Sequence, residues 1–284
     1  MALVGGLLLT VAGLAGPAPR PVVPSALAAP LAPGTTTIDL SGWKLSIPVK
    51  NSKGTPTLLQ PATPVAPWMV PDANGALVFW APASGVTTEN SSHPRTELDS
   101  LTNFAAGSSG QIHTLHATVA VHQEPQDGEG IILGQIHGAD NISSVAFVML
   151  RYQRGQVRVA VKQVQKGSST AYYPLASGVP LNTPFDFGIS DMGNGNLVFS
   201  ITRNGRILRV PAVVPVVFRG ATVRFQAGSY QQAEKSAGPQ DGGKVTFHRL
   251  SELPVTPSPG APAAVTPPPA TPAPVAPAPI GVAP

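Results

Sequence analysis

The stretch LVFSITRNGRILRV, residues 197–210, indicates the fold class of this chain more clearly than any other segment. Two runs with the composition of β-strands, residues 197–203 and 206–210, flank the dipeptide Asn204-Gly205. A two-residue type I′ turn requires positive φ at both central positions, and Asn-Gly is the dipeptide most often found there. The stretch therefore predicts a β-hairpin.

Further segments show the pattern of β-strands rather than of helices. Apolar and polar residues alternate with a period of two in several of them, and no stretch of useful length has helical period. The predicted strands are residues 95–99, 115–121, 157–162, 185–189, 222–232 and 244–250. Many short strands separated by Gly, Pro and Asn turns predict an all-β protein, a two-sheet sandwich or jelly roll.

The composition narrows the possible functions. The chain has 284 residues, of which 42% are hydrophobic and only 11% are charged, and it contains no cysteine. Disulfides and thiolate metal sites are therefore excluded. Lys plus Arg exceed Asp plus Glu by 18 to 14 without any Lys/Arg-rich run. This modest excess suits a polyanionic partner but is not the clustered basic patch of a nucleic-acid-binding protein.

The two ends of the chain differ from its middle. The N-terminus is apolar but too short and glycine-rich for a comfortable membrane span, and Ala26-Leu27-Ala28 has the form of a signal-peptidase site, although no Lys or Arg precedes the apolar run. A disordered apolar N-terminus is the alternative. We expect a secreted, monomeric protein without a membrane span in its mature form. Its parts are a signal peptide (1–28), a linker (29–35), one folded domain (36–252) and a Pro/Ala/Thr-rich extended tail (253–284).

The segment RTELD, residues 95–99, places charged side chains on one face if it forms a strand. Arg95, Glu97 and Asp99 then point to the same side, because side chains alternate along a strand. A carboxylate two positions from a guanidinium can hold it in place, charged and ready to bind an incoming carboxylate. An ordinary surface ion pair is the alternative interpretation of this segment taken alone.

The segment IILGQIHG, residues 131–138, combines a strongly apolar strand with a polar pair near its end. A period of two puts Gln135 and His137 on one face and Ile132 and Ile136 on the other. This pattern fits the floor of a groove. It also fits the solvated face of an ordinary antiparallel sheet.

The segment RFQAGSYQQ, residues 224–232, has one largely polar face. A glycine in the middle of that face leaves room for a close approach to the backbone. Tyr230 on such a face is either a functional residue or a packing residue at the rim. The residues that share the face are Arg224, Gln226, Gly228, Tyr230 and Gln232.

In this order and spacing, the three segments resemble the signature motifs of the polysaccharide lyase family 7 alginate lyases. Those motifs are R-[ST]-E-L, Q-[IV]-H and Y-x-K-x-G-x-Y-x-Q, and they stand here as RTEL at 95–98, QIH at 135–137 and RFQAGSYQQ at 224–232. The flanking sequences SGWKLSIPV, IILGQIHG and KVTFHRLSE extend the resemblance over about residues 38–251. The resemblance implies a β-jelly roll whose concave sheet binds an acidic polysaccharide.

The resemblance also implies a reaction, the β-elimination of a 4-linked uronate. A base removes the proton at C5, the C4–O bond breaks, and fixed donors stabilise the dianion-like intermediate. Arg95 and Gln135 are then expected to neutralise the sugar carboxylate. His137 is expected to be the base toward guluronate, and Tyr230 the proton donor to the leaving oxygen and the base toward mannuronate. Ile136 accompanies activity on guluronate-containing chains, and the scheme requires no metal or other cofactor.

Six further side chains are expected to bind the substrate. Two of them depart from the family pattern, because Arg224 stands where the first tyrosine of the third motif is expected and Gln226 where its lysine is expected. The missing lysine should weaken the binding of one sugar carboxylate, and Arg224 projects from the same face. The six residues are Glu97, Arg158, Lys162, Arg224, Gln226 and Gln232.

Other functions stay open at this point. A lyase for another polyuronate, such as glucuronan, would use the same side chains, and a non-catalytic module that binds acidic glycans would use the same groove. A jelly-roll glycoside hydrolase would need facing carboxylates, but no further glutamate follows Glu97 and Asp99 in the required pattern. A zinc site is disfavoured, because His113 points to the opposite face from His116 and His122.

Overall fold

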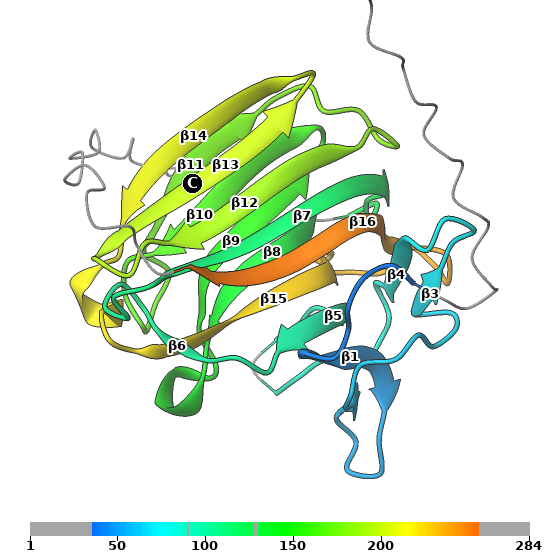
Figure 1. Cartoon of the computed structure of the whole chain (residues 1–284). Helices are drawn as coiled ribbons and strands as arrows, with labels where there is room; N and C mark the ends of the chain where they lie inside the picture. Colours follow the sequence, from blue (N-terminus) through cyan, green and yellow to red (C-terminus); the bar gives the residue numbers. More distant parts are fainter. Residues whose placement is uncertain (1–35, 90, 128–129, 256–284) are drawn as a thin grey trace, which may run out of the picture. The chain divides into compact units, whose positions relative to one another are not determined.

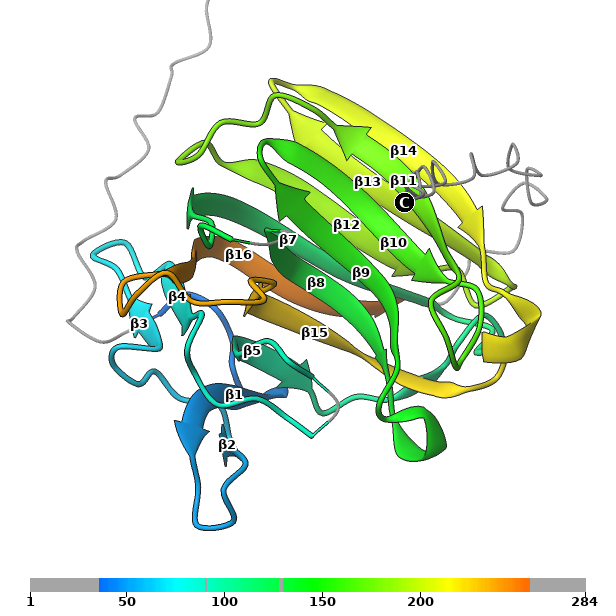
Figure 2. The same cartoon turned by 180° about the vertical axis from the view of Figure 1, so that it is seen from behind.

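The computed structural model describes residues 36–89, 91–127 and 130–255, and these form two antiparallel β-sheets packed face to face (Figures 1 and 2). Two single-turn 3-10 helices, η1 (Asp140–Ile142) and η2 (Val216–Phe218), lie in connections between strands. In this part of the chain, no helix has the length and apolar character needed to cross a membrane.

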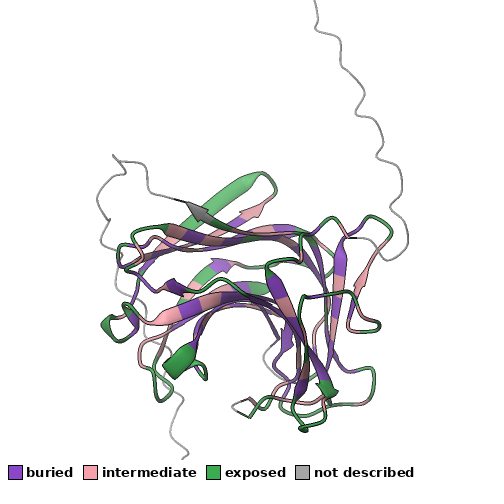
Figure 3. Ribbon diagram, turned by 60° about the horizontal axis from the view of Figure 1, so that its bottom comes forward, coloured by how far each residue is buried: buried purple, intermediate pink, exposed green. Residues whose placement is uncertain are grey.

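The larger sheet has nine strands and is strongly bent, with its concave face turned away from the other sheet (Figure 3). Its strands follow the order β11-β10-β9-β8-β15-β5-β1-β2, and β6 pairs with β15. They are β1 (Trp43–Lys50), β2 (Pro56–Leu59), β5 (Arg95–Ser100), β6 (Phe104–Ala105), β8 (Ile131–Gly138), β9 (Ala146–Gln153), β10 (Gln156–Lys162), β11 (Thr170–Ala176) and β15 (Thr222–Gln231).

The smaller sheet has seven strands in the order β14-β13-β12-β7-β16-β4-β3 and covers the convex face of the larger one (Figure 1). Its strands are β3 (Met69–Pro71), β4 (Leu77–Pro82), β7 (Ile112–Gln123), β12 (Phe185–Asp191), β13 (Asn196–Arg203), β14 (Arg206–Val213) and β16 (Gly242–Val255).

Apolar side chains from the alternating strands fill the space between the sheets. Phe79 of β4 and Phe247 of β16 are fully buried and pack edge to face, with ring centroids 5.2 Å apart. Phe147 of β9 stacks on Phe218 of η2 at 4.4 Å. Burying one such side chain contributes about 1.5–3 kcal/mol. Since the chain has no cysteine, this core and the strand pairing hold the sheets together.

The hairpin prediction is confirmed. Residues 196–203 and 206–213 pair as β13 and β14, and Asn204 and Gly205 adopt φ values of 51° and 71°. The other predicted strands correspond to β5, β7, β8, β10, β12, β15 and β16, and the predicted strand 222–232 extends one residue past the end of β15. The fold class follows from these segments because each shows a clear alternation or an unambiguous turn.

Seven strands were not predicted: β1, β2, β3, β4, β6, β9 and β11. Proline explains part of this, because Pro56, Pro71 and Pro174 lie in β2, β3 and β11, all at sheet edges, where a strand tolerates a missing N–H. Strand β16 also continues to Val255, past residue 252, where we expected the domain to end. The predicted signal peptide, the linker and residues 256–284 of the predicted tail lie outside the described residues.

The predicted orientation of Ile132 is wrong. The pairing of β8 with β9 skips Leu133, so that Ile132 lies opposite Arg151 and Gly134 opposite Leu150. This β-bulge shifts the alternation by one residue. Ile132 therefore shares the face of Arg151, whereas Ile136 packs in the core as predicted.

The close approach predicted at Gly228 is made by a neighbouring strand. Gly228 lies opposite Glu97 of β5, and a Cβ atom at this position would overlap the Thr96 carbonyl oxygen. We expect Gly228→Ala to lower the free energy of unfolding by about 1–3 kcal/mol, the usual cost of overpacking. Urea denaturation measures the change. Gly42→Ala is the control, because a Cβ atom at Gly42 meets nothing within 4 Å, and equal stability of both variants would contradict the prediction.

Candidate active site

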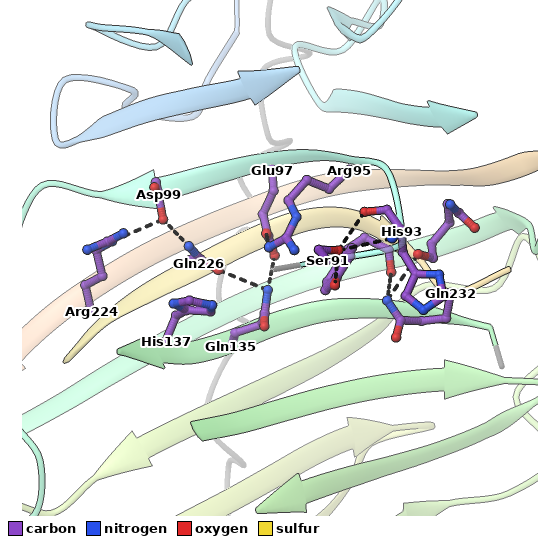
Figure 4. Close-up of polar contacts among 12 residues, drawn as sticks. Ser91, His93, Arg95, Glu97, Asp99, Gln135, His137, Arg224, Gln226 and Gln232 are labelled. Atoms are coloured by element: carbon purple, nitrogen blue, oxygen red, sulfur yellow. Dashed lines mark hydrogen bonds and ion pairs between the residues drawn. The ribbon is translucent and has the colours of Figure 1, made fainter. Parts of the chain in front are cut away.

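Strands β5, β15 and β8 lie side by side in the middle of the larger sheet, and their register brings the three polar segments together (Figure 4). Gln226 lies opposite Asp99 on one side and Gln135 on the other. Tyr230 lies opposite Arg95. Directly opposite residues of antiparallel strands present their side chains on the same face, so the pairing alone gathers most of the predicted site.

A chain of hydrogen bonds connects these side chains (Figure 4). Gln226 donates to Asp99, and Gln135 Nε2 donates both to Gln226 Oε1 at 3.1 Å and to Glu97 Oε1 at 2.6 Å. Arg95 Nη1 donates to Glu97 Oε2 at 3.2 Å. Both N–H bonds of the Gln135 amide are thus occupied, and its buried Oε1 has no hydrogen-bond partner among the described residues.

Asp99 is held by two cations. Lys44 Nζ lies 3.3 Å from Asp99 Oδ2, and Arg224 Nε donates to Oδ1 at 3.2 Å. Burial acts to raise the pKa of Asp99, but the charges of Arg224 and Lys44 outweigh it and hold the pKa below its ordinary value. Asp99 is therefore an anion at neutral pH, and it fixes Arg224 in position.

For Glu97, the effect of burial on the pKa outweighs the effect of the neighbouring cation. Its side chain is 2% exposed, and burial raises its pKa to about 6 despite the nearby Arg95 charge and the hydrogen bond from Gln135. Desolvation destabilises the ionised form, and one cation compensates only part of that cost. Glu97 was predicted to bind substrate. In the structure its two carboxylate oxygens accept hydrogen bonds from Gln135 and Arg95.

His137 is half-buried at the end of β8, opposite Arg224 of β15. Its Nδ1 lies 3.0 Å from the Gly138 carbonyl oxygen, which can only accept, so Nδ1 carries the hydrogen and Nε2 is an unprotonated acceptor. Burial lowers the pKa of His137 to about 4, and the charges of Arg95 and Arg224 act in the same direction. At neutral pH the ring is neutral and can take up a proton.

Tyr230 is more enclosed than its place on a polar face suggests. It is 8% exposed, and the Arg95 guanidinium carbon lies 3.6 Å from the centre of its ring. Its hydroxyl lies 2.8 Å from Ser91 Oγ, in the segment between β4 and β5. Tyr230 thus contacts a cation through its ring and a hydroxyl through its oxygen.

The other predicted substrate-binding residues lie to one side of this cluster. Gln232 accepts a hydrogen bond from Arg151 at 3.3 Å. Arg158 lies opposite Arg151 and donates to Gln153 Oε1 at 3.0 Å. Lys162, at the end of β10, donates to the Gly167 carbonyl oxygen at 2.9 Å. These residues extend the polar face across β9 and β10.

Sequence reasoning missed three side chains that contact the cluster. Lys44 pairs with Asp99, Arg151 with Gln232 and Ser91 with Tyr230. A signal was present for the first two, because each is a cation in a mostly apolar strand: Lys44 follows Trp43 at the start of WKLSIPVK, and Arg151 is the one cation of AFVMLRYQ. Ser91 lies outside any strand and had no periodic signal.

A pocket of about 230 Å³ opens on this face, lined among others by Lys44, Arg95, His137, Arg224 and Gln226. Glu97 and Asp99 also line it, so the three cations exceed the two carboxylates by one, an excess that suits a carboxylated ligand. A larger hollow of about 290 Å³ lies at Asp39, Trp43 and Glu252 and has no basic residue in its lining. Across the described residues, no group of three or more His, Asp or Glu side chains is placed to hold a metal ion.

Comparison with known proteins identifies the family. The model of the alginate lyase family matches residues 38–252. The structure of alginate lyase A1-II', a member of polysaccharide lyase family 7, is 27% identical, with a TM-score of 0.65 over 77% of this chain and 96% of that one. An alginate lyase from Pseudomonas aeruginosa is 28% identical, with a TM-score of 0.65 over 76% and 99% of the two chains.

A double variant of alginate lyase A1-II', with a histidine replaced by asparagine and a tyrosine by phenylalanine, has been crystallised with its substrate GGMG. It is 26% identical, with a TM-score of 0.65 over 81% of this chain and 99% of that one. A search of curated proteins finds no significant match. The shared architecture confirms the predicted β-jelly roll. The chain therefore belongs to the alginate lyase family and is a polysaccharide lyase of family 7.

Proposed function

We propose that this lyase is secreted and cleaves guluronate-containing alginate by β-elimination to give 4,5-unsaturated oligosaccharides. The observation that carries the proposal is the meeting of Arg95, Gln135, His137 and Tyr230 on one face of three adjacent strands. These residues supply a cation, an amide, a neutral imidazole and a phenol. Elimination next to a carboxylate requires charge neutralisation, a base and an acid, and this set contains all three.

Charge neutralisation falls to Arg95, with Arg224 close by. The C5 proton is weakly acidic while the adjacent carboxylate is ionised, so the site has to stabilise the extra negative charge that develops. Arg95 lines the pocket and is fixed by Glu97. Gln135 is fully buried, and its N–H groups bond Glu97 and Gln226, so it supports Glu97 beside Arg95.

His137 acts as the base toward guluronate in this proposal, and Tyr230 as the acid. The unprotonated Nε2 of His137 can accept the C5 proton, since the lowered pKa keeps the ring neutral. The substrate complex of a histidine and tyrosine variant of A1-II' supports giving these two residue types the central roles. The preference for guluronate rests on the resemblance to the family at Ile136. This side chain is buried in the core, so any effect on substrate choice is indirect.

Secretion is proposed from the sequence alone. The apolar N-terminus ends in Ala26-Leu27-Ala28, the small-x-small pattern of a signal-peptidase site. An extracellular location also fits a large polymeric substrate. N-terminal sequencing of protein recovered from the culture medium tests this proposal, since cleavage after Ala28 leaves Ala29 as the first residue.

The reaction class can be tested with polyguluronate, polymannuronate and polyglucuronate. We expect ultraviolet absorbance from the new C4=C5 double bond to rise fastest on polyguluronate or mixed chains. Mass spectrometry of the products should show no oxygen gained from water. Saturated products carrying water oxygen would identify a hydrolase, and cleavage of polymannuronate alone would refute the guluronate preference.

Tyr230→Phe removes the hydroxyl and keeps the ring against Arg95. If the hydroxyl protonates the leaving oxygen, kcat and kcat/KM should fall together by about 10²–10⁴-fold, the usual contribution of general acid catalysis. Initial rates on polyguluronate measure both. Tyr173→Phe is the matched control, because Tyr173 packs against Phe199 away from the site. Retention of most of the kcat by Tyr230→Phe would remove Tyr230 from the catalytic set.

The fall of kcat/KM on the acidic side of its pH profile (the acidic limb) should follow the protonation of Glu97. As pH falls through about 6, Glu97 becomes protonated and loses the charge that holds Arg95, so kcat/KM should fall there. In Glu97→Gln this titration is absent, and the limb should move toward about pH 4, where His137 is protonated. Glu124→Gln is the control, because Glu124 also has a raised pKa but binds the Arg154 backbone N–H. An unmoved limb in Glu97→Gln would contradict this assignment.

A further inference from the structure

Ser91 is fixed directly beside the hydroxyl of Tyr230. Its backbone N–H donates to the Thr88 carbonyl oxygen at 3.0 Å. Its Oγ lies 3.0 Å from the His93 carbonyl oxygen, 3.1 Å from the His93 backbone nitrogen and 2.8 Å from the Tyr230 hydroxyl. The His93 ring in turn donates from Nδ1 to the Ala233 carbonyl oxygen, just beyond β15, at 3.0 Å. Ser91 is therefore tethered to the strand that carries Tyr230 (Figure 4).

The hydrogen-bonding capacity of a hydroxyl sets the direction of the contact. Ser91 Oγ has one hydrogen and two lone pairs. The hydrogen goes to the His93 carbonyl oxygen, which can only accept, and one lone pair accepts the His93 backbone N–H. What remains is one lone pair, so Tyr230 is the donor to Ser91. In this state the phenolic hydrogen points at Ser91, and the lone pairs of the Tyr230 oxygen are left for another donor.

We infer that Ser91 is a positioning residue that controls the hydroxyl hydrogen of Tyr230 and stabilises the phenolate formed in the elimination. This inference rests on the proposed function. In the reaction, the C5 proton passes to His137, the C4–O bond breaks, and the Tyr230 proton passes to the leaving oxygen. The product gains a double bond and a hydroxyl, and the enzyme is left with a protonated imidazole and a phenolate.

Ser91 can serve both states of Tyr230 because its hydroxyl both accepts and donates. Before the reaction it accepts from the phenol. Afterwards its own hydrogen turns from the His93 carbonyl oxygen to the phenolate, where a charge-assisted hydrogen bond is stronger than a neutral one. The Arg95 guanidinium, 3.6 Å from the ring centre, stabilises the same negative charge. A proton returning from His137 through solvent restores the starting state.

The test compares Ser91→Ala with Ser91→Thr, which keeps a hydroxyl. Wild-type turnover of polyguluronate is measured first. We expect Ser91→Ala to lower kcat about tenfold, the effect of losing one hydrogen bond to a group that becomes charged, with KM nearly unchanged. Ser91→Thr should recover most of the loss. Ser92→Ala is the matched control, because the one hydrogen bond of its hydroxyl to a described residue is with His93 Nε2, at 3.2 Å.

A double-mutant cycle separates an effect through Tyr230 from general damage to the segment. In the Tyr230→Phe background, Ser91→Ala should cause no further loss of kcat, since the group it serves is absent. A full kcat in Ser91→Ala, or an equal loss in both backgrounds, would overturn the inference while leaving the lyase assignment intact. A wild-type enzyme without unsaturated products on any of the three polyuronates would instead overturn the proposed function.

Discussion

The unbroken pairing of β15 with β5 is the constraint on which the rest of the site depends. Five consecutive residues of β15, from Gln226 to Tyr230, lie opposite Asp99 to Arg95 without a shift in register. The third residue of this run, Gly228, has no side chain to push the strands apart. A slip of one residue would send Arg95 and Tyr230 to opposite faces. Tyr230 and the Arg95 guanidinium over its ring therefore remain together only while these two backbones stay in close contact.

Two buried carboxylates hold the cations of the site: Asp99 pairs with Lys44 and Arg224, and Glu97 pairs with Arg95. Asp99 contacts two cations, which keep its pKa below the ordinary value, whereas Glu97 is paired with one cation and its pKa is raised to about 6. Glu97 accepts a hydrogen bond directly from Gln135, and Asp99 is linked to the same Gln135 through the amide of Gln226. Buried charges are costly unless paired, and the pairing here places fixed cations beside the pocket. Because Glu97 holds Arg95 only while it is ionised, the position of the Arg95 side chain depends on the pH of the solution.

The fold class could be predicted because it follows from local patterns, whereas the expected site residues came from the resemblance to the family motifs. Alternation and the Asn204-Gly205 turn are properties of neighbouring residues, and they gave the hairpin and the all-β class. What could not be predicted depends on contacts between distant segments. The bulge at Leu133, which turns Ile132 over, is set by pairing with β9, and the burial of Tyr230 beneath Arg95 depends on a neighbouring strand.

The third motif differs from the family pattern at its first and third positions, and the two differences together shift its positive charge by two residues. Where the motif has a neutral tyrosine and a cationic lysine two positions later, this chain has cationic Arg224 and neutral Gln226. Two residues along a strand are about 6.6 Å. The cation thus leaves the row of Gln135 for the row of His137, with Asp99 as its anchor. The motif therefore keeps its single positive charge, and that charge lies beside the ring of His137 and not beside the amide of Gln135.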